Sequence, residues 1–385
     1  MLQRYSLNGE EIDSLDLKFL LITSGINIPA QQIYERFGAT HRANVTDPTA
    51  CECFLLSDGV VVLIYPNATS PFTMGIAETG RAYIAHEGRF LTEIDFPPHT
   101  EFYEQRTSQG RPFAQFSVLP APDLLTFPYL WPCDHAQAGF ACQFCYPGRE
   151  SQRLAAEGKP EPASPTPHEV GEVVDFVFNV EQFGSDVIIT GGTKKDARAE
   201  CPLCVQTLVA IDEVAGLENI PGEILVYTSA PSDHTALDAV FEAGADRVAI
   251  DLEVYDQELF QRVCPGKAPF TSHETQLGAL EYVVESYGRG RACSTFVVGV
   301  EPLESLLAGV DYIASRGIVP LLPVLSHTNP AMAMMGELPQ LDYYRRVLEA
   351  YAEAYDKYDL QPPSRGQWGP CLCGDARRHR KEILA

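Results

Sequence analysis

Three cysteines in the short stretch "CDHAQAGFACQFC" could bind a metal together: Cys133, Cys142 and Cys145. Two residues separate Cys142 from Cys145, a spacing that lets both thiolates reach one metal ion or cluster, and Cys133 joins them from across a loop. Structural zinc sites usually have four ligands, whereas a four-iron cluster with three thiolate ligands keeps one iron free for a small molecule. The stretch favours such a cluster, with zinc or another metal, a disulfide framework and unrelated thiols as alternatives.

The composition narrows the class of protein. The chain has 385 residues, eleven cysteines and a formal net charge of -24. An odd number of cysteines cannot pair completely within one molecule, which favours metal ligation over disulfides. The acidic charge argues against nucleic acid or an anionic membrane as the main partner, because phosphate binding uses clustered Lys and Arg. No apolar run approaches the ~20 residues of a membrane span, and no signal peptide is evident, so we expect a cytoplasmic protein.

From about residue 166, short apolar runs alternate with amphipathic stretches that end at glycine. Thr166, Pro167 and Glu169 form a capping box that predicts the start of one such helix. The expected strands are 126–132, 185–192, 222–230, 245–255, 291–302 and 318–325, and the expected helices are 166–184, 204–214, 232–243, 273–287 and 303–316.

Apolar strands separated by helices predict a parallel sheet covered by helices. Such a sheet either opens as a doubly wound fold or curls towards a barrel. In both cases, ligands bind at the carboxyl ends of the strands. The three cysteines directly follow the first expected strand, where chemistry is expected.

The chain divides into three expected parts. Residues 1–120 form an N-terminal β-rich accessory domain, because apolar runs flank turn residues in two hairpin-like segments, 51–66 and 81–96. Residues 121–330 form the core, in which we expect 151–167 to be a mobile loop. Residues 331–385 supply a helix, with apolar residues at helical spacing, and a tail.

Over about residues 126–327 the sequence resembles the radical S-adenosylmethionine (radical SAM) superfamily. The resemblance rests on Phe144 just before the third cysteine, on the position of the cysteines after the first strand, and on the order of strands and helices that follows. The common spacing in that superfamily has three residues between the first two cysteines, whereas this chain has eight, so the subfamily is unassigned.

The resemblance implies a partial (β/α)6 TIM-like barrel in an α/β fold. It also implies a [4Fe-4S] cluster ligated by Cys133, Cys142 and Cys145, and reductive cleavage of S-adenosylmethionine (SAM) to a 5'-deoxyadenosyl radical that removes hydrogen from a substrate. An electron donor such as flavodoxin or ferredoxin would be a partner.

The same resemblance implies residues that hold SAM. Gly191 and Gly192 match the first two residues of a Gly-Gly-Glu motif, in which Thr193 here replaces the acid, and Gly299 matches a fifth-strand motif that holds adenine. Glu253 ends the fourth strand at a level that often binds ribose or methionine. The full expected set is Phe144, Gly191, Gly192, Thr193, Thr228, Ser229, Glu253, Val298, Gly299 and Glu301.

Each of these residues has a plainer interpretation. A glycine pair after a strand is often only a turn, and Glu253 could be an ordinary strand-end carboxylate. We expect Cys264 to be a packed or solvent-facing thiol rather than a catalytic hydrogen donor, and His135 and His327 to be loop histidines rather than ligands. Lys267 could meet a carboxylate, but we expect it to be solvated. A second metal site could combine Cys201, Cys204, Cys371 and Cys373, whereas Cys51 and Cys53 alone specify no metal.

The sequence therefore predicts a radical SAM enzyme that acts on a small-molecule substrate, because neither a basic groove nor a peptide-recognition element is evident. Two alternatives stay open. The same cluster could support SAM-dependent aminocarboxypropyl or methyl transfer, or the thiolates could hold zinc in a non-catalytic regulatory module.

Overall fold

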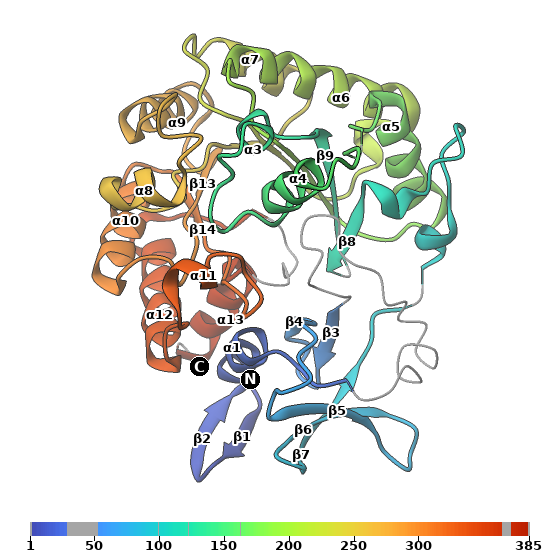
Figure 1. Cartoon of the computed structure of the whole chain (residues 1–385), viewed down its shortest axis with the longest axis vertical. Helices are drawn as coiled ribbons and strands as arrows, with labels where there is room; N and C mark the ends of the chain where they lie inside the picture. Colours follow the sequence, from blue (N-terminus) through green and yellow to red (C-terminus); the bar gives the residue numbers. More distant parts are fainter. Residues whose placement is uncertain are drawn as a thin grey trace.

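The computed structural model describes residues 2–28, 53–98, 100–121, 123–161, 163–363 and 371–383. Its centre is a seven-stranded sheet in the order β14-β13-β12-β11-β10-β9-β8, in which only β8 runs antiparallel to its neighbour. The six parallel strands confirm the predicted core (Figure 1). The strands are β8 (Val118–Ala121), β9 (Leu124–Leu130), β10 (Asp186–Gly191), β11 (Ile224–Tyr227), β12 (Arg247–Ala249), β13 (Ala292–Thr295) and β14 (Val319–Leu321).

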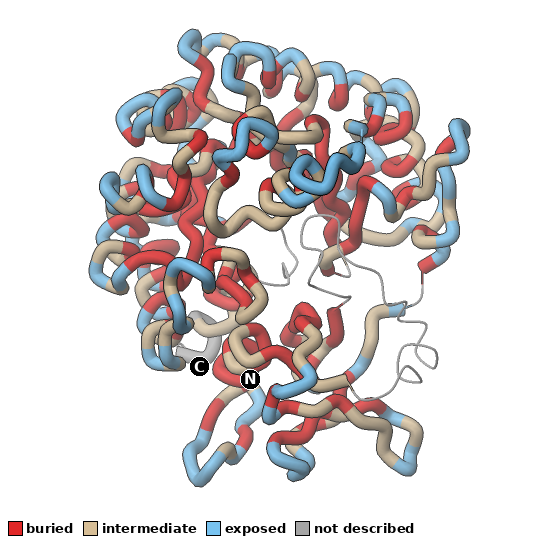
Figure 2. The backbone as a smooth tube through the Cα atoms, in the orientation of Figure 1, coloured by how far each residue is buried: buried red, intermediate tan, exposed pale blue. Residues whose placement is uncertain are grey.

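Helices cover the outer face of this curled sheet (Figure 1). Because the strands are buried on both faces, most of their residues are apolar. Figure 2 shows these buried strands inside helices that are partly exposed. Thr166 and Glu169 form the predicted capping box at the start of α5. The covering helices are α5 (Pro167–Asp175), α6 (Glu200–Ala215), α7 (Ala236–Glu242), α8 (Gln257–Val263), α9 (His273–Tyr287) and α10 (Leu303–Ser315).

The cysteine region folds into two helices, α3 (Asp134–Gln137) and α4 (Tyr146–Ala156). Residues 151–156 belong to α4, so the prediction of a loop over 151–167 was wrong for its first part. The helix forms because Cys145 caps its N-terminus, with its sulfur accepting a hydrogen bond from the Gly148 N–H, and proline occupies an early position.

The N-terminal part contains a separate antiparallel sheet in the order β4-β3-β7-β6-β5. Both predicted hairpins are present in the described residues, β3–β4 and β6–β7, whereas Cys51 lies outside these residues. The division at residue 120 stays a prediction. The elements are β1 (Arg4–Leu7), β2 (Glu10–Asp13), α1 (Ser14–Ser24), β3 (Cys53–Leu56), β4 (Val61–Leu63), β5 (Phe72–Ile76), β6 (Ala82–His86) and β7 (Arg89–Asp95).

The core sheet does not close into a full barrel, because β8 and β14 are its two edges. The N-terminal part contacts both sides of this opening: β4 packs against β8, and α1 packs against α12 (Leu341–Tyr358). A short C-terminal segment also reaches β14, since Cys371 forms an antiparallel bridge with Pro323.

Helix α1 is joined to the C-terminal part by buried charges. The Lys18 ammonium lies 2.6 Å from the Asp375 carboxylate of α13 (Cys373–Ile383), and both side chains are almost fully buried. Arg345 of α12 makes a bidentate ion pair with Asp16, both distances being 2.8 Å. The first and last described helices therefore lie side by side. Among the described helices, none combines the length and hydropathy needed to cross a bilayer.

Candidate active site

A cavity of about 610 Å³ lies inside the curled sheet, at the carboxyl ends of its parallel strands. This is the end at which α/β barrels bind their ligands. The strands contribute Pro128, Thr190, Gly191, Tyr227, Thr295 and Leu321 to its wall. The connections that follow the strands contribute the groups that could do chemistry: Cys133, Cys142, Cys145, Gly192, Thr193, Asp251, Glu253 and Lys267.

All three predicted cluster ligands line this cavity. Cys133 comes just after β9 and precedes the first turn of α3, whereas Cys145 caps α4. Within the described ranges, no three Cys, His, Asp or Glu side chains are grouped closely enough to hold a single metal ion. Three thiolates are the donor set of a four-iron cluster that keeps one iron free for a small molecule.

The glycine turn after β10 packs directly against the first cysteine. A Cβ atom at Gly192 would lie 2.6 Å from Cys133 Cα, so only glycine permits this approach. The Asp134 N–H donates to the Thr193 carbonyl at 3.0 Å, and the Asp134 carboxylate lies 3.2 Å from the Lys194 ammonium. The cysteine loop and the glycine turn therefore form one connected unit.

A buried ion pair lies in the wall of the cavity. The Lys267 ammonium is 2.5 Å from a Glu253 carboxylate oxygen, and Glu253 has a φ of +69°, which side-chain-bearing residues rarely adopt. The expectation that Lys267 is solvated was therefore wrong. Sequence patterns could not identify the carboxylate partner, because thirteen residues, among them helix α8, separate Lys267 from Glu253.

Burial raises the pKa of Glu253 to about 7, and the positive charge of Lys267 opposes this change. Burial also acts to lower the pKa of Lys267, but Glu253 and the other acidic groups nearby outweigh it and hold that pKa well above its ordinary value. Near neutral pH the lysine is thus cationic, whereas Glu253 is easily neutralised. The pair can therefore offer a positive charge to an anionic ligand group.

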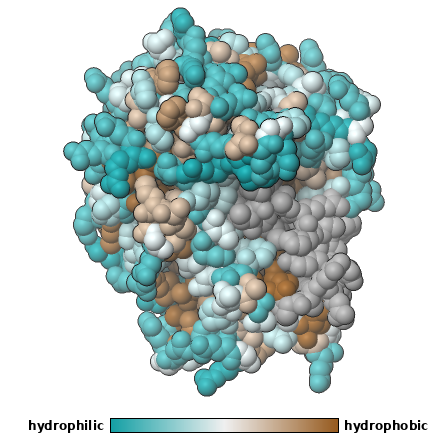
Figure 3. All heavy atoms as spheres, viewed as in Figure 1, coloured by the Kyte–Doolittle hydropathy of each residue, from teal (hydrophilic) through white to brown (hydrophobic). Residues whose placement is uncertain are grey.

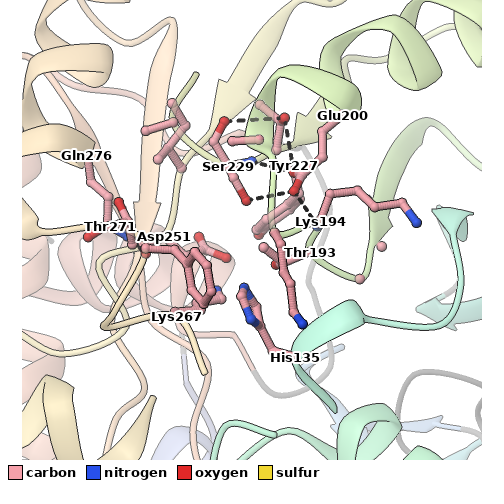
Figure 4. Close-up of a pocket in the computed structure, with 18 of the residues that line it drawn as sticks. His135, Thr193, Lys194, Glu200, Tyr227, Ser229, Asp251, Lys267, Thr271 and Gln276 are labelled. Carbon is pink, nitrogen blue, oxygen red and sulfur yellow. Dashed lines mark hydrogen bonds between the residues drawn. The ribbon is translucent and has the colours of Figure 1, made fainter. Parts of the chain in front are cut away.

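A second, smaller pocket of about 100 Å³ adjoins the glycine turn (Figure 4). Its central hydrogen-bond acceptor is Glu200, the first residue of α6, which our sequence analysis did not select. The Glu200 carboxylate accepts hydrogen bonds from the Lys194 N–H at 2.7 Å and from the Ser229 N–H and hydroxyl at 2.7 and 3.0 Å. Thr228 also contacts it at 3.4 Å.

Thr228 and Ser229 lie beside the glycine turn, but their polar groups face Glu200 and line the smaller pocket rather than the cavity. Glu200 connects the turn after β10 to the end of β11 and so fixes the positions of these two segments beside the smaller pocket. Its buried position raises its pKa, against the donors that surround it. Any part that Thr228 and Ser229 play in SAM binding stays a prediction.

The fifth-strand residues that were predicted to hold SAM lie outside the cavity wall. Val298, Gly299 and Glu301 do not line the cavity, although the neighbouring Val297 does. Glu301 accepts hydrogen bonds from the Tyr255 N–H at 2.9 Å and from the Ser305 hydroxyl at 2.6 Å. It thereby connects the start of α10 to the loop after β12. A contact of these three residues with adenine stays a prediction.

Phe144 lines the cavity, and its carbonyl accepts a hydrogen bond from the Asn329 side-chain amide at 3.2 Å. The Tyr146 hydroxyl lies 2.7 Å from the Ser326 hydroxyl. The loop after β14 therefore contacts both neighbours of Cys145, through the Phe144 backbone and the Tyr146 side chain. On the opposite side of that loop, His327 contacts Tyr65 of the N-terminal part, and burial lowers the pKa of His327.

The remaining cysteines do not form the second metal site considered above. Cys201 and Cys204 are buried on α6 near Tyr129, whereas Cys371 and Cys373 lie at the β14 edge with their sulfurs 2.6 Å apart. The described residues contain no metal-binding group made from them. Cys264 is a buried thiol beside Cys142, as the interpretation of a packed cysteine requires.

Comparison with known proteins agrees with this geometry. A family model described as the Radical SAM superfamily matches residues 138–305. A bacteriochlorophyllide c C-7(1)-hydroxylase of Chlorobaculum limnaeum is 26% identical over 264 residues, which cover 66% of this chain and 65% of the relative, slightly less than two thirds of its length.

Solved structures were also matched. Coproporphyrinogen III oxidase (HemN) of Escherichia coli, a radical SAM enzyme, matches at 15% identity with a TM-score of 0.37, covering 62% of this chain and 54% of that one. A radical SAM methyltransferase from Sphaerobacter thermophilus matches at 13% identity with a TM-score of 0.43, covering 80% and 82%.

The matched family segment contains Cys142 and Cys145, the glycine turn and the Glu253–Lys267 pair, so the family model and the cavity concern the same part of the chain. The non-catalytic zinc module is thereby set aside. Residues 138–305 therefore match the radical SAM superfamily, whose enzymes use a [4Fe-4S] cluster and SAM.

Proposed function

We propose that this enzyme cleaves SAM reductively and removes a hydrogen atom from a small-molecule substrate. One observation carries the proposal: the three thiols, the glycine turn and the Glu253–Lys267 pair all open onto the same cavity. Three thiols complete only three of the four iron ligands of a cluster, which leaves one iron for SAM. The donor set and the close approach of Gly192 to Cys133 fit that cofactor.

In this proposal Cys133, Cys142 and Cys145 hold the cluster. When bound, the reduced cluster supplies the electron that divides SAM into methionine and a 5'-deoxyadenosyl radical. The glycine turn presents backbone groups to the methionine part, because neither Gly191 nor Gly192 has a side chain to prevent close contact. Lys267 provides a cationic group for a ligand carboxylate, and Glu253 sets how far that charge is neutralised.

The cavity wall also protects a reactive species from water. Pro128, Val297 and Leu321 are apolar parts of the wall, and the surrounding helices cover the sheet from outside. Excluding water prevents side reactions of reactive intermediates. The volume of about 610 Å³ lies within the roughly 300–1,000 Å³ that small-molecule sites occupy, which supports a small-molecule substrate.

The hydroxylase relative favours a reaction in which a substrate C–H bond becomes C–OH. Removal of hydrogen from carbon is the first requirement of that change, and a 5'-deoxyadenosyl radical is suited to it. We therefore place hydroxylation first among the substrate reactions to test. We also propose a cytoplasmic location and a flavodoxin- or ferredoxin-type electron donor.

Product analysis under anaerobic, reducing conditions tests the proposal. Wild-type enzyme with a reconstituted cluster should convert SAM to 5'-deoxyadenosine and methionine. Cys142→Ala should lose this turnover, whereas the matched control Cys201→Ala, whose thiol is buried outside the cavity, should retain it. Turnover that survives in Cys142→Ala would contradict the proposed ligand set.

The same experiment distinguishes group transfer, which the methyltransferase among the structural matches illustrates. Methylthioadenosine would indicate aminocarboxypropyl transfer, and S-adenosylhomocysteine would indicate methyl transfer. Either product in place of 5'-deoxyadenosine would replace the proposed reaction while leaving the cofactor assignment intact.

A further inference from the structure

One loop contacts both the N-terminal part and the segment that carries Cys145. It consists of residues 326–329, with the sequence Ser-His-Thr-Asn, and lies between β14 and α11 (Met332–Met335). His327 contacts the N-terminal part, whereas its neighbours in the loop contact the residues beside Cys145. We call residues 326–329 the bridge loop.

His327 lies in a socket formed by two segments of the N-terminal part. At the end of α1, a Cβ atom on Gly25 would lie 2.3 Å from Cε1 of the His327 ring, so only glycine permits this approach. In the second segment, the Tyr65 ring meets the His327 ring edge-on, with 6.5 Å between the ring centres. The imidazole also has a hydrogen bond with the Ile22 backbone. The histidine side chain is therefore held by residues far from it in the sequence.

Hydrogen bonds within the N-terminal part keep this socket in shape. The Asn67 side-chain amide donates to the Ser24 carbonyl at 2.8 Å, and the Ile26 N–H donates to the Tyr65 carbonyl at 2.8 Å. These bonds attach the end of α1 to the connection that follows β4. Because both walls of the socket are fixed to each other, the His327 ring has a defined position between them.

The rest of the bridge loop holds the segment around Cys145. The Asn329 side-chain amide donates to the Phe144 carbonyl at 3.2 Å, just before this cysteine. The Ser326 hydroxyl lies 2.7 Å from the Tyr146 hydroxyl, just after it. The residues on either side of His327 thus contact the residues on either side of Cys145.

Helix α4, which Cys145 caps, has little apolar surface with which to fix its own position. Of its eleven residues, only Gly148 and Ser151 are buried. Figure 3 shows mostly hydrophilic residues on the face of the molecule where this helix lies. Helices in proteins are held in place mainly by the packing of an apolar face. Polar contacts at the N-terminus of α4 therefore have a large share in setting the position of Cys145.

We propose that His327 is a positioning residue through which the N-terminal part sets the position of Cys145 at the cavity. The inference rests on the function proposed above, because Cys145 serves the reaction only as a cluster ligand. While the imidazole occupies its socket, the bridge loop is fixed, and so are its contacts to Phe144 and Tyr146. Loss of the imidazole releases the loop, so that Cys145 adopts a wider range of positions and holds the cluster less uniformly.

Hydrogen–deuterium exchange of the full-length, cluster-free protein tests this chain of contacts. In His327→Ala, peptides that contain residues 143–149 should exchange about five- to tenfold faster than in wild type, the size expected when a hydrogen-bonded contact is lost. Peptides from β11 and β12 should exchange as in wild type, which distinguishes a local effect from general destabilisation. The matched control is His168→Ala, since the His168 side chain is 62% exposed on α5, and its exchange over 143–149 should not change.

Asn329→Asp breaks the same chain at its other end, because an isosteric carboxylate replaces the amide that donates to the Phe144 carbonyl. It should raise exchange over 143–149 to a similar degree. The double variant with His327→Ala should differ little from either single variant, since both act through one loop. If His327→Ala does not fold, His327→Gln, which keeps a donor for the Ile22 backbone, takes its place with a smaller increase over the same peptides.

Electron paramagnetic resonance of the reduced, reconstituted enzyme gives a second readout. The cluster signal should be broader in His327→Ala and in Asn329→Asp than in wild type, and unchanged in His168→Ala. Exchange and spectra equal to those of wild type in the histidine and asparagine variants would overturn the positioning role. Fully additive effects in the double variant would overturn it as well.

The exchange measurement separates this inference from the proposed function, because it needs neither cluster nor SAM. If wild-type enzyme reduced with dithionite fails to cleave SAM, the proposed function is wrong, and exchange still decides whether His327 acts on residues 143–149. If wild type cleaves SAM and neither variant changes exchange or spectra, only the positioning role is wrong.

Discussion

Two lysine–carboxylate pairs are buried in this protein, and their surroundings differ. Lys18 and Asp375 lie 2.6 Å apart between α1 and α13, with side chains that are 0% and 1% exposed. Lys267 and Glu253 lie 2.5 Å apart in the cavity wall, with side chains that are 20% and 7% exposed. The first pair has only protein around it, whereas the second faces space that a ligand can occupy.

The comparison teaches that burial of an ion pair does not by itself indicate a functional site. Removing two charges from water raises the free energy of the folded state, and only close, well-oriented ion-pair and hydrogen-bond partners offset that increase. At the α1–α13 junction the partners are permanent. In the cavity, the left-handed backbone of Glu253 shows that the chain tolerates local strain to place that carboxylate, a sign of function when it occurs at a cavity.

The largest effect should follow from breaking the junction pair. Asp375→Leu leaves Lys18 charged and buried without its partner, so the free energy of unfolding should fall by about 3–5 kcal/mol. Chemical denaturation monitored by circular dichroism measures this change. The double variant Lys18→Met with Asp375→Leu should recover most of the loss, and a double variant as unstable as the single one would contradict a purely structural role.

Gly192→Ala should have the next largest effect, because its Cβ atom would collide with the Cys133 backbone. We expect a loss of about 1–3 kcal/mol in stability together with reduced iron content after reconstitution. Iron and sulfide analysis provides the readout. Gly278→Ala is the control, since this half-buried glycine of α9 would place its Cβ at an ordinary contact distance of 3.4 Å from the His234 ring, and it should keep full iron content.

Lys267→Met should show most clearly how the cavity pair differs from the junction pair in its effects on stability and turnover. Stability should fall by only about 1–2 kcal/mol, less than at the junction, because Glu253 takes up a proton readily once its partner is lost. Turnover of SAM should nevertheless fall roughly tenfold or more, as expected for the loss of a charge-assisted contact to a ligand. A stability loss as large as that of Asp375→Leu with normal turnover would show that both pairs are structural.

The smallest effect should come from Tyr146→Phe, which removes the hydrogen bond to Ser326 beside Cys145. We expect a loss of about 0.5–1.5 kcal/mol in thermal or chemical unfolding. Electron paramagnetic resonance of the reduced cluster should show a changed signal if this contact helps to orient Cys145. Identical stability and spectra would show that the hydrogen bond from Tyr146 to the loop after β14 has no influence on the segment that carries Cys145.

The order of strands and helices could be predicted because it depends on local patterns. Apolar runs predicted β9 to β14, glycines predicted the helix ends, and Thr166 with Glu169 predicted the start of α5. The position of the three cysteines at the end of β9 followed from the general rule for parallel sheets. Once the sheet curls, the three cysteines face one common cavity.

The polar surroundings of the site depend on contacts between distant segments, so sequence could not predict them. Glu200 appeared to be an ordinary acidic residue at a helix start, yet it joins the ends of two strands through Ser229 and Lys194. Lys267 lies in a loop whose composition resembles that of solvated loops. Only the packing of α8 against the sheet brings its ammonium group to Glu253.

The unclosed edge between β8 and β14 has a consequence for how such enzymes diversify. A complete eight-stranded barrel fills its centre with its own side chains, which must change together if the centre is to change. Here β4 and α1 meet the two sides of the opening from a separate part of the chain. Substitutions or insertions in that part can therefore change the surroundings of the two sheet edges, while the strands beside the cavity remain as they are.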